Sequence, residues 1–260
     1  MNTAATILVV NCNTDEAMTS AIAAIARDAA RGDTRIVGIG PSWGPRSAEG
    51  YLESFATAVA TIDAVLAYEH PFDAVVMAGY GEHGREGMRQ AVRQPVVDIT
   101  EASAYVACLV GHRFGVVTTV SSAIAGIEDS LRSAGVHDRC AGIVASDVAV
   151  SHIADEPDST RSALLRAARA VVARGADVVV LGCAGFAGLD DELERALGLP
   201  VIDGVASAVA LAESLVSLGK RTSTAGPYAP ADATKQWLGI RPGAFGELLP
   251  VRGTVVEPSS

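Results

Sequence analysis

The sequence predicts an α/β protein of two pseudo-symmetric lobes, each a mostly parallel sheet flanked by helices, with an active site in the cleft between them. Three observations predict this fold. Short β-branched runs alternate with Ala-rich stretches of helical length, which is the pattern of βαβ units. The short runs are continuously apolar, as strands covered by helices on both faces are. Several strand ends also recur at a nearly constant offset along the chain.

The predicted strands are the short apolar runs, most of which are followed by a turn that contains Gly or Asn. They cover residues 6–11, 35–39, 74–78, 95–98, 114–118, 142–146, 177–182 and 200–203. The predicted helices are the Ala-rich stretches between these runs, because they are longer than strands usually are. They cover residues 15–31, 48–68, 84–92, 100–110, 121–134, 159–174, 190–196 and 204–218.

An internal repeat divides these elements into two sets. Residues 73–81 and 177–185 share a strand-and-turn pattern at an offset of 104 residues. Two further strand ends recur in the same order, residues 95–98 at 200–203 and residues 9–11 at 116–118. Strand ends that recur in order at nearly constant spacing indicate two similar lobes related by a pseudo-twofold axis.

The repeat also sets the expected boundaries of the lobes. We expect residues 1–99 with 205–220 to form lobe 1, since the last helix should cross back to the first sheet. Residues 100–204 should form lobe 2. Residues 221–260 should form a C-terminal tail, because Pro and Gly become frequent there and the periodicity fades.

The composition excludes several classes of protein. The chain has 260 residues, 49% of them apolar and 19% charged, so it can bury a large core. Its net charge of −10 makes nucleic acid an unsuitable partner, and no apolar run reaches the roughly 18 residues that cross a membrane. The four cysteines contain no CxxC pair and the histidines show no ligand spacing, so we expect no metal, free thiols and a cytoplasmic location.

Cys183 is the strongest candidate for a catalytic residue. It lies in a Gly-rich turn directly after the most apolar strand, and ligands of parallel sheets bind at the carboxyl ends of strands. Backbone N–H groups in such a turn lower the pKa of a thiol toward neutrality, which suits an acid or base. A small buried hydrophobe is the alternative. We expect Cys12, Cys108 and Cys140 to be structural, although Cys12 lies in a cleft loop.

Residues 79–84 form a second Gly-rich turn, of the GxGxxG type found in dinucleotide-binding proteins, with Asp98 at the end of the next strand. Three features oppose nicotinamide binding. The turn follows the third strand rather than the first, the helix after it is short, and the repeat pairs Gly79 with Cys183. We expect His83 to be a solvated loop residue, and Asp98 and Asp203 to cap helices.

Short polar side chains end the equivalent first strands of the two lobes, at residues 11–14 and 118–121. Such side chains can cap the following helix, and they can also present hydroxyl, amide and backbone N–H donors to an anionic ligand. We expect both roles to hold together.

These motifs resemble those of the aspartate/glutamate racemase superfamily, most closely its hydantoin racemase branch, which includes allantoin racemase. The resemblance runs over about residues 5–218 and rests on residues 11–14, 40–41, 44–51, 117–119 and 181–187. It implies a cofactor-independent enzyme with a small-molecule substrate. It also implies two cysteines, one from each lobe, on opposite faces of the substrate carbon. One thiolate removes the proton, and the other thiol delivers a proton to the far face. We further expect a homo-oligomer.

One departure from the family pattern is large. The first catalytic cysteine of the branch lies in a turn of the form Ala-Cys-Phe-Gly-Asp-Pro-Gly, and here Gly79 stands at the cysteine position. The branch has Pro where this chain has Cys12. A two-base racemase cannot run in both directions with one thiol. Either an inactivating replacement has been introduced at Gly79, or the chain is a natural one-cysteine member. The arylmalonate decarboxylase branch is similar in having glycine there.

The sequence thus predicts a hydantoin racemase that acts on 5-monosubstituted hydantoins by proton transfer at C5, in an inactive or one-sided form. An arylmalonate-decarboxylase-like enzyme is the first alternative, and a non-catalytic small-molecule or dinucleotide binder is the second. The expected catalytic positions are Cys183 and Gly79, the latter as the place of the missing thiol. The expected substrate-binding residues are Asn11, Asn13, Tyr80, Gly81, Thr118, Thr119, Ala184 and Gly185.

Overall fold

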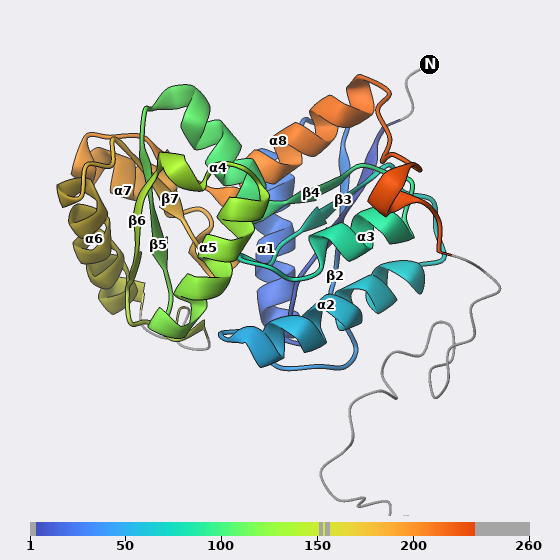
Figure 1. The fold of residues 1–260 in the computed structure, drawn as a ribbon, viewed down its shortest axis with the longest axis horizontal. Helices are drawn as coiled ribbons and strands as arrows, with labels where there is room; N and C mark the ends of the chain where they lie inside the picture. Colours follow the sequence, from blue (N-terminus) through green and yellow to red (C-terminus); the bar gives the residue numbers. More distant parts are fainter. Residues whose placement is uncertain (1–3, 151–152, 154–156, 232–260) are drawn as a thin grey trace, which may run out of the picture.

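The structure is a computed structural model that describes residues 4–150, 153 and 157–231, and it consists of two α/β lobes side by side (Figure 1). Each lobe contains a four-stranded parallel sheet. The strand order is β2-β1-β3-β4 in the first sheet and β6-β5-β7-β8 in the second. The two orders are the same once the numbering is shifted by four, so the predicted pair of similar parallel-sheet lobes is confirmed.

The strands lie close to the predicted positions. They are β1 (Thr6–Val10), β2 (Arg35–Ile39), β3 (Ala74–Met77), β4 (Val96–Asp98), β5 (Phe114–Thr118), β6 (Cys140–Ala145), β7 (Val178–Leu181) and β8 (Val201–Ile202). The helices are α1 (Glu16–Ala29), α2 (Tyr51–Leu66), α3 (Arg85–Ala91), α4 (Ile99–Val110), α5 (Ile124–Ser133), α6 (Pro157–Ala173), α7 (Asp190–Leu197) and α8 (Gly204–Ser217). Short 3-10 turns are η1 (Ser121–Ala123), η2 (His137–Arg139), η4 (Ala184–Phe186) and η5 (Gly226–Tyr228).

The repeat extends to individual hydrogen bonds at the start of β3 and β7. The Asp73 carboxylate accepts the backbone N–H of Thr6 at 2.8 Å, which ties the start of β3 to β1. The Asp177 carboxylate accepts the N–H of Arg113 at 2.8 Å and thereby ties the start of β7 to β5 in the same way. Two equivalent aspartates therefore fix the register of the central strand pair in each lobe.

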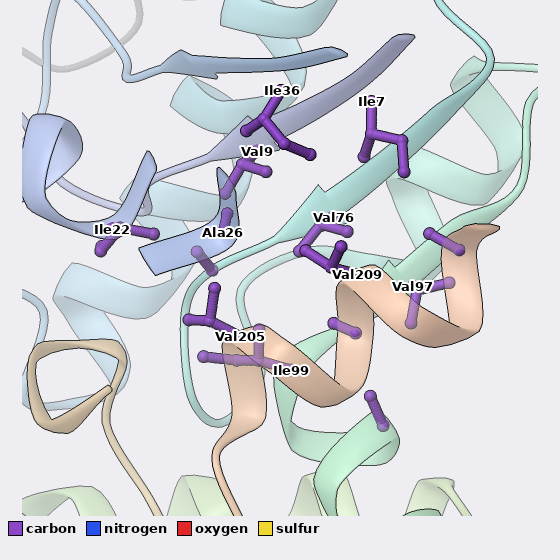
Figure 2. Packing of buried hydrophobic residues seen from close by; sticks show 14 of the residues in the cluster. Ile7, Val9, Ile22, Ala26, Ile36, Val76, Val97, Ile99, Val205 and Val209 are labelled. Carbon is purple, nitrogen blue, oxygen red and sulfur yellow. The ribbon is translucent and has the colours of Figure 1, made fainter. Parts of the chain in front are cut away.

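Helices cover both faces of each sheet, as the continuously apolar strands predict. In the first lobe, Val9 of β1 points toward α1 and α8, and its neighbour Val10 points to the opposite face, toward α2 and α3. Successive residues of a strand face opposite sides, so both faces need apolar side chains. Figure 2 shows the first of these layers, with Val205 and Val209 of α8 against the strand residue Val76.

The helix α8 packs on the first sheet although it follows the last strand of the second lobe. The helix α4 joins the lobes, because its Ile99 packs in the first core and its Ala107 in the second. After α8 the chain returns to lobe 1, where Thr222 donates to the carbonyl of Gln94 at 2.7 Å. The exact lobe boundaries stay a prediction, and residues 232–260 of the predicted tail lie outside the described residues.

The predicted helix over 48–68 is three residues too long at its start. The helix begins at Tyr51 because Gly50 is extended, with φ −151° and ψ 176°. The residues before it instead form a loop that reaches the other lobe. In the part of the chain that the structure describes, no helix has both the length and the apolar character needed to cross a membrane.

Candidate active site

A cleft lies between the lobes at the carboxyl ends of β1, β3, β5 and β7. Seven of the predicted site residues line it, namely Asn11, Asn13, Tyr80, Thr118, Thr119, Cys183 and Ala184. Gly81 lines an adjoining hollow that shares Tyr80 and His83 with the cleft. The structure therefore brings these residues together at one site, as the rule for parallel sheets predicts.

The loop before α2 and the first residue of α2 both bond to lobe 2 beside this cleft. The Glu49 carboxylate accepts the backbone N–H of Val150 at 3.0 Å. The Tyr51 hydroxyl donates to the Asp129 carboxylate at 2.7 Å. Both bonds join lobe 1 to lobe 2, so they hold the lobes together at the rim of the cleft.

Cys183 follows β7 and lines the cleft. Its Sγ accepts the backbone N–H of Gly185 at 3.3 Å, so the turn presents a donor to the sulfur as predicted. The predicted direction of the pKa shift is wrong, however. Burial raises the pKa of the Cys183 thiol to about 11, because the loss of hydration outweighs the backbone donors. In the free protein Cys183 is therefore a neutral thiol at pH 7.

Asn11 and Asn13 form a small amide network at the end of β1. The Asn13 Oδ1 accepts the backbone N–H of Asp15 at 3.0 Å and the Asn11 Nδ2 at 2.9 Å. A backbone N–H can only donate, so this pair of bonds fixes which amide atom of each residue is oxygen. The Asn11 nitrogen is also bonded to Thr19. Asn11 was expected to donate to a ligand, but its nitrogen is engaged.

The Asn11 Oδ1 differs from the engaged nitrogen of the same amide. It is buried and has no hydrogen-bond partner among the described residues. Asn11 lines the cleft, so this oxygen is an acceptor available to a ligand N–H. A buried polar atom without a partner costs about 1–3 kcal/mol, and a bound N–H group would remove that cost.

The equivalent end of β5 carries Thr118 and Thr119. The Thr118 hydroxyl donates to the carbonyl of Gly182 at 3.2 Å, which joins the ends of β5 and β7 beside Cys183. The carbonyl of Thr119 accepts the Ser146 hydroxyl at 3.4 Å. Both threonines are buried and line the cleft, so their strand end forms part of its wall.

The turn after β3 holds Tyr80 and Gly81. The Gly81 backbone N–H donates to the Thr100 hydroxyl at 2.8 Å. This N–H was expected to bind a ligand, and it is unavailable because Thr100 of α4 uses it. The Tyr80 hydroxyl lies 3.3 Å from that of Ser103, so the tyrosine ring packs against α4 while it lines the cleft.

Gly79 itself is enclosed by two side chains. A Cβ built on Gly79 would lie 2.5 Å from His83 Cδ2 and 2.7 Å from the Cys12 Cβ. Its φ is not in the left-handed region, so the backbone would accept another residue. The space, however, is filled. A side chain at this position would therefore have to displace His83 or Cys12.

His83 is a buried residue rather than the solvated one that was expected, with only 4% of its surface exposed. Its Nε2 lies 3.1 Å from the Tyr80 carbonyl, which can only accept, so Nε2 carries the proton. Its Nδ1 is buried without a partner among the described residues. Burial lowers the pKa of His83 below its usual value, so the ring is neutral.

Cys12 and His83 are cleft residues to which the sequence analysis gave no role at the site, although both stand in loops that were expected to line the cleft. Both line the cleft with Cys183. The signal for Cys12 was its position directly after a strand end, which is the same signal that identified Cys183. No pattern in the sequence indicated that His83 folds back over Gly79.

Asp98, the last residue of β4, and Asp203, the residue after β8, cap helices as predicted. Asp98 accepts the N–H groups of Thr100 and Glu101 at the start of α4. Asp203 accepts those of Val205 and Ala206 at the start of α8. Burial raises the pKa of Asp98 to about 7, in spite of its capping bonds. Among the residues that the structure describes, no group of three or more His, Cys, Asp or Glu is placed to hold a metal ion.

Two similar parallel-sheet lobes that share a thiol-lined cleft define the class of this protein. Residues 7–212 match the Asp/Glu/Hydantoin racemase family. A hydantoin racemase from Pseudomonas sp. (strain NS671) is 38% identical over 224 residues, which cover 85% of this chain and 90% of that protein. The crystal structure of allantoin racemase from Pseudomonas fluorescens has a TM-score of 0.88 at 47% identity, covering 90% of this chain and all of that one. The chain belongs to the Asp/Glu/hydantoin racemase family.

A more distant structural likeness concerns the alternative that this chain is an arylmalonate-decarboxylase-like enzyme. The crystal structure of arylmalonate decarboxylase has a TM-score of 0.57 at 17% identity, and it covers 83% of this chain. At this identity the likeness reaches the fold alone. The racemase relatives share both fold and sequence with this chain, so the family supports a racemase.

Proposed function

We propose that this racemase acts on 5-monosubstituted hydantoins, by proton transfer at C5 and without a cofactor. The observation that carries the proposal is the Cys183 thiol, which faces the cleft with the Gly185 N–H 3.3 Å from its sulfur. That N–H stabilises the thiolate once a ligand has displaced solvent. The hydantoin and allantoin racemases among the relatives support the substrate class, because both act on a five-membered ring with alternating N–H and C=O groups.

The C5 proton of such a ring is acidic because the carbanion delocalises onto the neighbouring carbonyl. The Cys183 thiolate removes this proton, and the enolate then needs preorganised donors. The Gly81 N–H is used by Thr100 and the Gly185 N–H by the sulfur, so we assign the enolate to the strand-end backbone at Thr119 and Ala184. The unpartnered Asn11 Oδ1 accepts a ring N–H.

Position 79 supplies no acid or base. With Cys183 acting alone, the protein would remove and return a proton on one face only. It would then exchange C5–H of one hydantoin enantiomer without inverting it. We therefore predict exchange without inversion if Cys183 is the only thiol that reaches C5.

The test is a mass-spectrometric assay of C5–H exchange in D₂O, on each enantiomer of a 5-alkyl hydantoin. We expect exchange with the unmodified chain, and in Cys183→Ala the loss of exchange of the enantiomer whose C5–H faces Cys183. Cys108→Ala of helix α4 is the matched control. If the chain left every hydantoin unlabelled but released CO₂ from an arylmalonate, the one-cysteine decarboxylase reading would replace this one. A thermal shift with a nicotinamide dinucleotide, in the absence of either reaction, would favour the non-catalytic binder.

A further inference from the structure

The sheet register places Cys12 directly beside Gly79. Strands β1 and β3 are parallel neighbours, and Val10 pairs with Met77. Two residues further along each strand, Cys12 follows β1 and Gly79 follows β3 at the same level of the sheet. Adjacent strands lie about 4.8 Å apart, so a side chain on one strand end can lean over the other.

The Cys12 side chain does lean over position 79. A Cβ built on Gly79 would lie 2.7 Å from the Cβ of Cys12, well inside van der Waals contact. Cys12 therefore occupies the space that a side chain at position 79 would enter. The His83 ring closes this space from the other side, 2.5 Å from the same built Cβ.

Cys12 and Cys183 reach one cleft from opposite lobes. Cys12 follows β1 of the first sheet, and Cys183 follows β7 of the second. The same cleft is lined by Asn11 and His83, whose Oδ1 and Nδ1 are buried without partners among the described residues. Two unpartnered buried acceptors indicate a ligand with N–H groups between the two thiols.

We propose that Cys12 is the second acid/base of this racemase, acting at the face of C5 opposite Cys183. This inference rests on the proposed function. In one direction the Cys183 thiolate takes the C5 proton and becomes a thiol. The enolate then takes a proton from the Cys12 thiol on the other face, and Cys12 becomes the thiolate. The reverse direction exchanges the two roles, so protons and charge balance and no co-reactant is needed.

The charge state of the pair suits this chemistry. Burial and, to a smaller extent, the negative charge of a thiolate on Cys183 together raise the pKa of Cys12 to about 12. Ionisation of one thiol therefore opposes ionisation of the other. Once one of the two thiols has ionised, the pair therefore holds one base and one acid, which a reversible two-base reaction requires.

The experiment measures two rates on single-enantiomer 5-alkyl hydantoins. Racemisation is followed by circular dichroism, and C5–H exchange in D₂O is followed by mass spectrometry after chiral separation. The proteins are the unmodified chain, Cys12→Ala, Cys12→Ser, Cys183→Ala and Cys108→Ala as the matched thiol control. Far-ultraviolet circular dichroism verifies the fold of each.

We expect the unmodified chain and Cys108→Ala to racemise both enantiomers. Cys12→Ala should lose racemisation by at least about 10²-fold, the usual contribution of a positioned acid or base, and still exchange one enantiomer through Cys183. Cys183→Ala should exchange the other enantiomer. This mirror-image pattern is the result that a merely structural role of Cys12 does not produce.

Three results would overturn the inference. Racemisation by Cys12→Ala close to the rate of the unmodified chain would show that another group protonates the far face, with His83 the first to test. Exchange of a single enantiomer by the unmodified chain would leave the hydantoin substrate standing but remove Cys12 from the reaction. An unmodified chain inert toward every hydantoin would overturn the proposed function and this inference together.

Discussion

At the residue scale, the raised pKa of Cys183 predicts how the proposed activity depends on pH. In the proposed reaction the base is the Cys183 thiolate, and the folded pKa of about 11 lies far above neutral pH. Below that pKa, the thiolate fraction rises about tenfold with each pH unit. We therefore expect log kcat/KM for C5–H exchange to rise with a slope of about +1 between about pH 7 and pH 9.

The measurement is the exchange rate at low substrate concentration across this range, with a protein-free sample at each pH. The blank matters because some hydantoins racemise unaided in alkali. A profile that became flat above about pH 7.5 would show a thiol pKa near neutrality, and the burial argument would fail.

Gly79 is the second residue whose surroundings lead to a prediction, here for the stability of a variant. The repeat alone suggests that Gly79→Cys would restore a missing thiol opposite Cys183. The structure predicts a cost instead, because the new Cβ would lie 2.5 Å from the His83 ring and 2.7 Å from the Cys12 Cβ. Overpacking of this kind costs about 1–3 kcal/mol. We therefore expect Gly79→Cys to lower the free energy of unfolding, measured by urea denaturation, by that amount.

Gly126→Ala is the matched control, since a Cβ at Gly126 meets nothing within 4 Å. It should leave stability unchanged or raise it slightly, as alanine is favoured over glycine in a helix. Unchanged stability of Gly79→Cys would mean that His83 and Cys12 move aside easily, and the crowded arrangement described here would be wrong.

At the scale of elements, Asp98 at the end of β4 and Asp203 directly after β8 each connect a strand to a helix. Asp203 serves two elements at once. It caps α8 through Val205 and Ala206, and its second oxygen accepts the N–H of Gly188 at 2.7 Å. It is also buried. Residue 203 therefore holds the start of α8 to the loop that follows Cys183.

We expect Asp203→Ala to lower the free energy of unfolding by about 2–4 kcal/mol, because it removes a helix cap and leaves a backbone N–H unpaired. Urea denaturation measures this loss, and the exposed Asp28→Ala on α1 is the control. A loss below about 0.5 kcal/mol would show that the connection carries little of the stability.

The elements were also the most predictable part of the molecule. The helices and strands follow from continuous apolar runs and their turns, which are local patterns. The start of α2 was missed, because the extended Gly50 serves the inter-lobe bond of Glu49 rather than the helix. That bond depends on Val150, which is 101 residues away, so no local pattern contains it.

At the scale of the whole molecule, the repeat predicted the two lobes, and the strand-end rule predicted which residues line the cleft. The contacts inside the cleft were not predictable in this way. The burial of His83, the use of the Gly81 N–H by Thr100 and the approach of Cys12 to Gly79 all depend on side chains from different strands. A single sequence specifies where strands end more clearly than how their side chains pack across the sheet.

The central claim is that proton transfer at C5 takes place in the cleft between the lobes and depends on Cys183. A circular-dichroism time course on one enantiomer of a 5-alkyl hydantoin tests it most directly, with the unmodified chain, Cys183→Ala and a protein-free sample side by side. We expect the signal to decay to zero with the unmodified chain and to follow the protein-free sample with Cys183→Ala. Decay at the same rate in both proteins would contradict the claim, because the thiol at the end of β7 would then take no part.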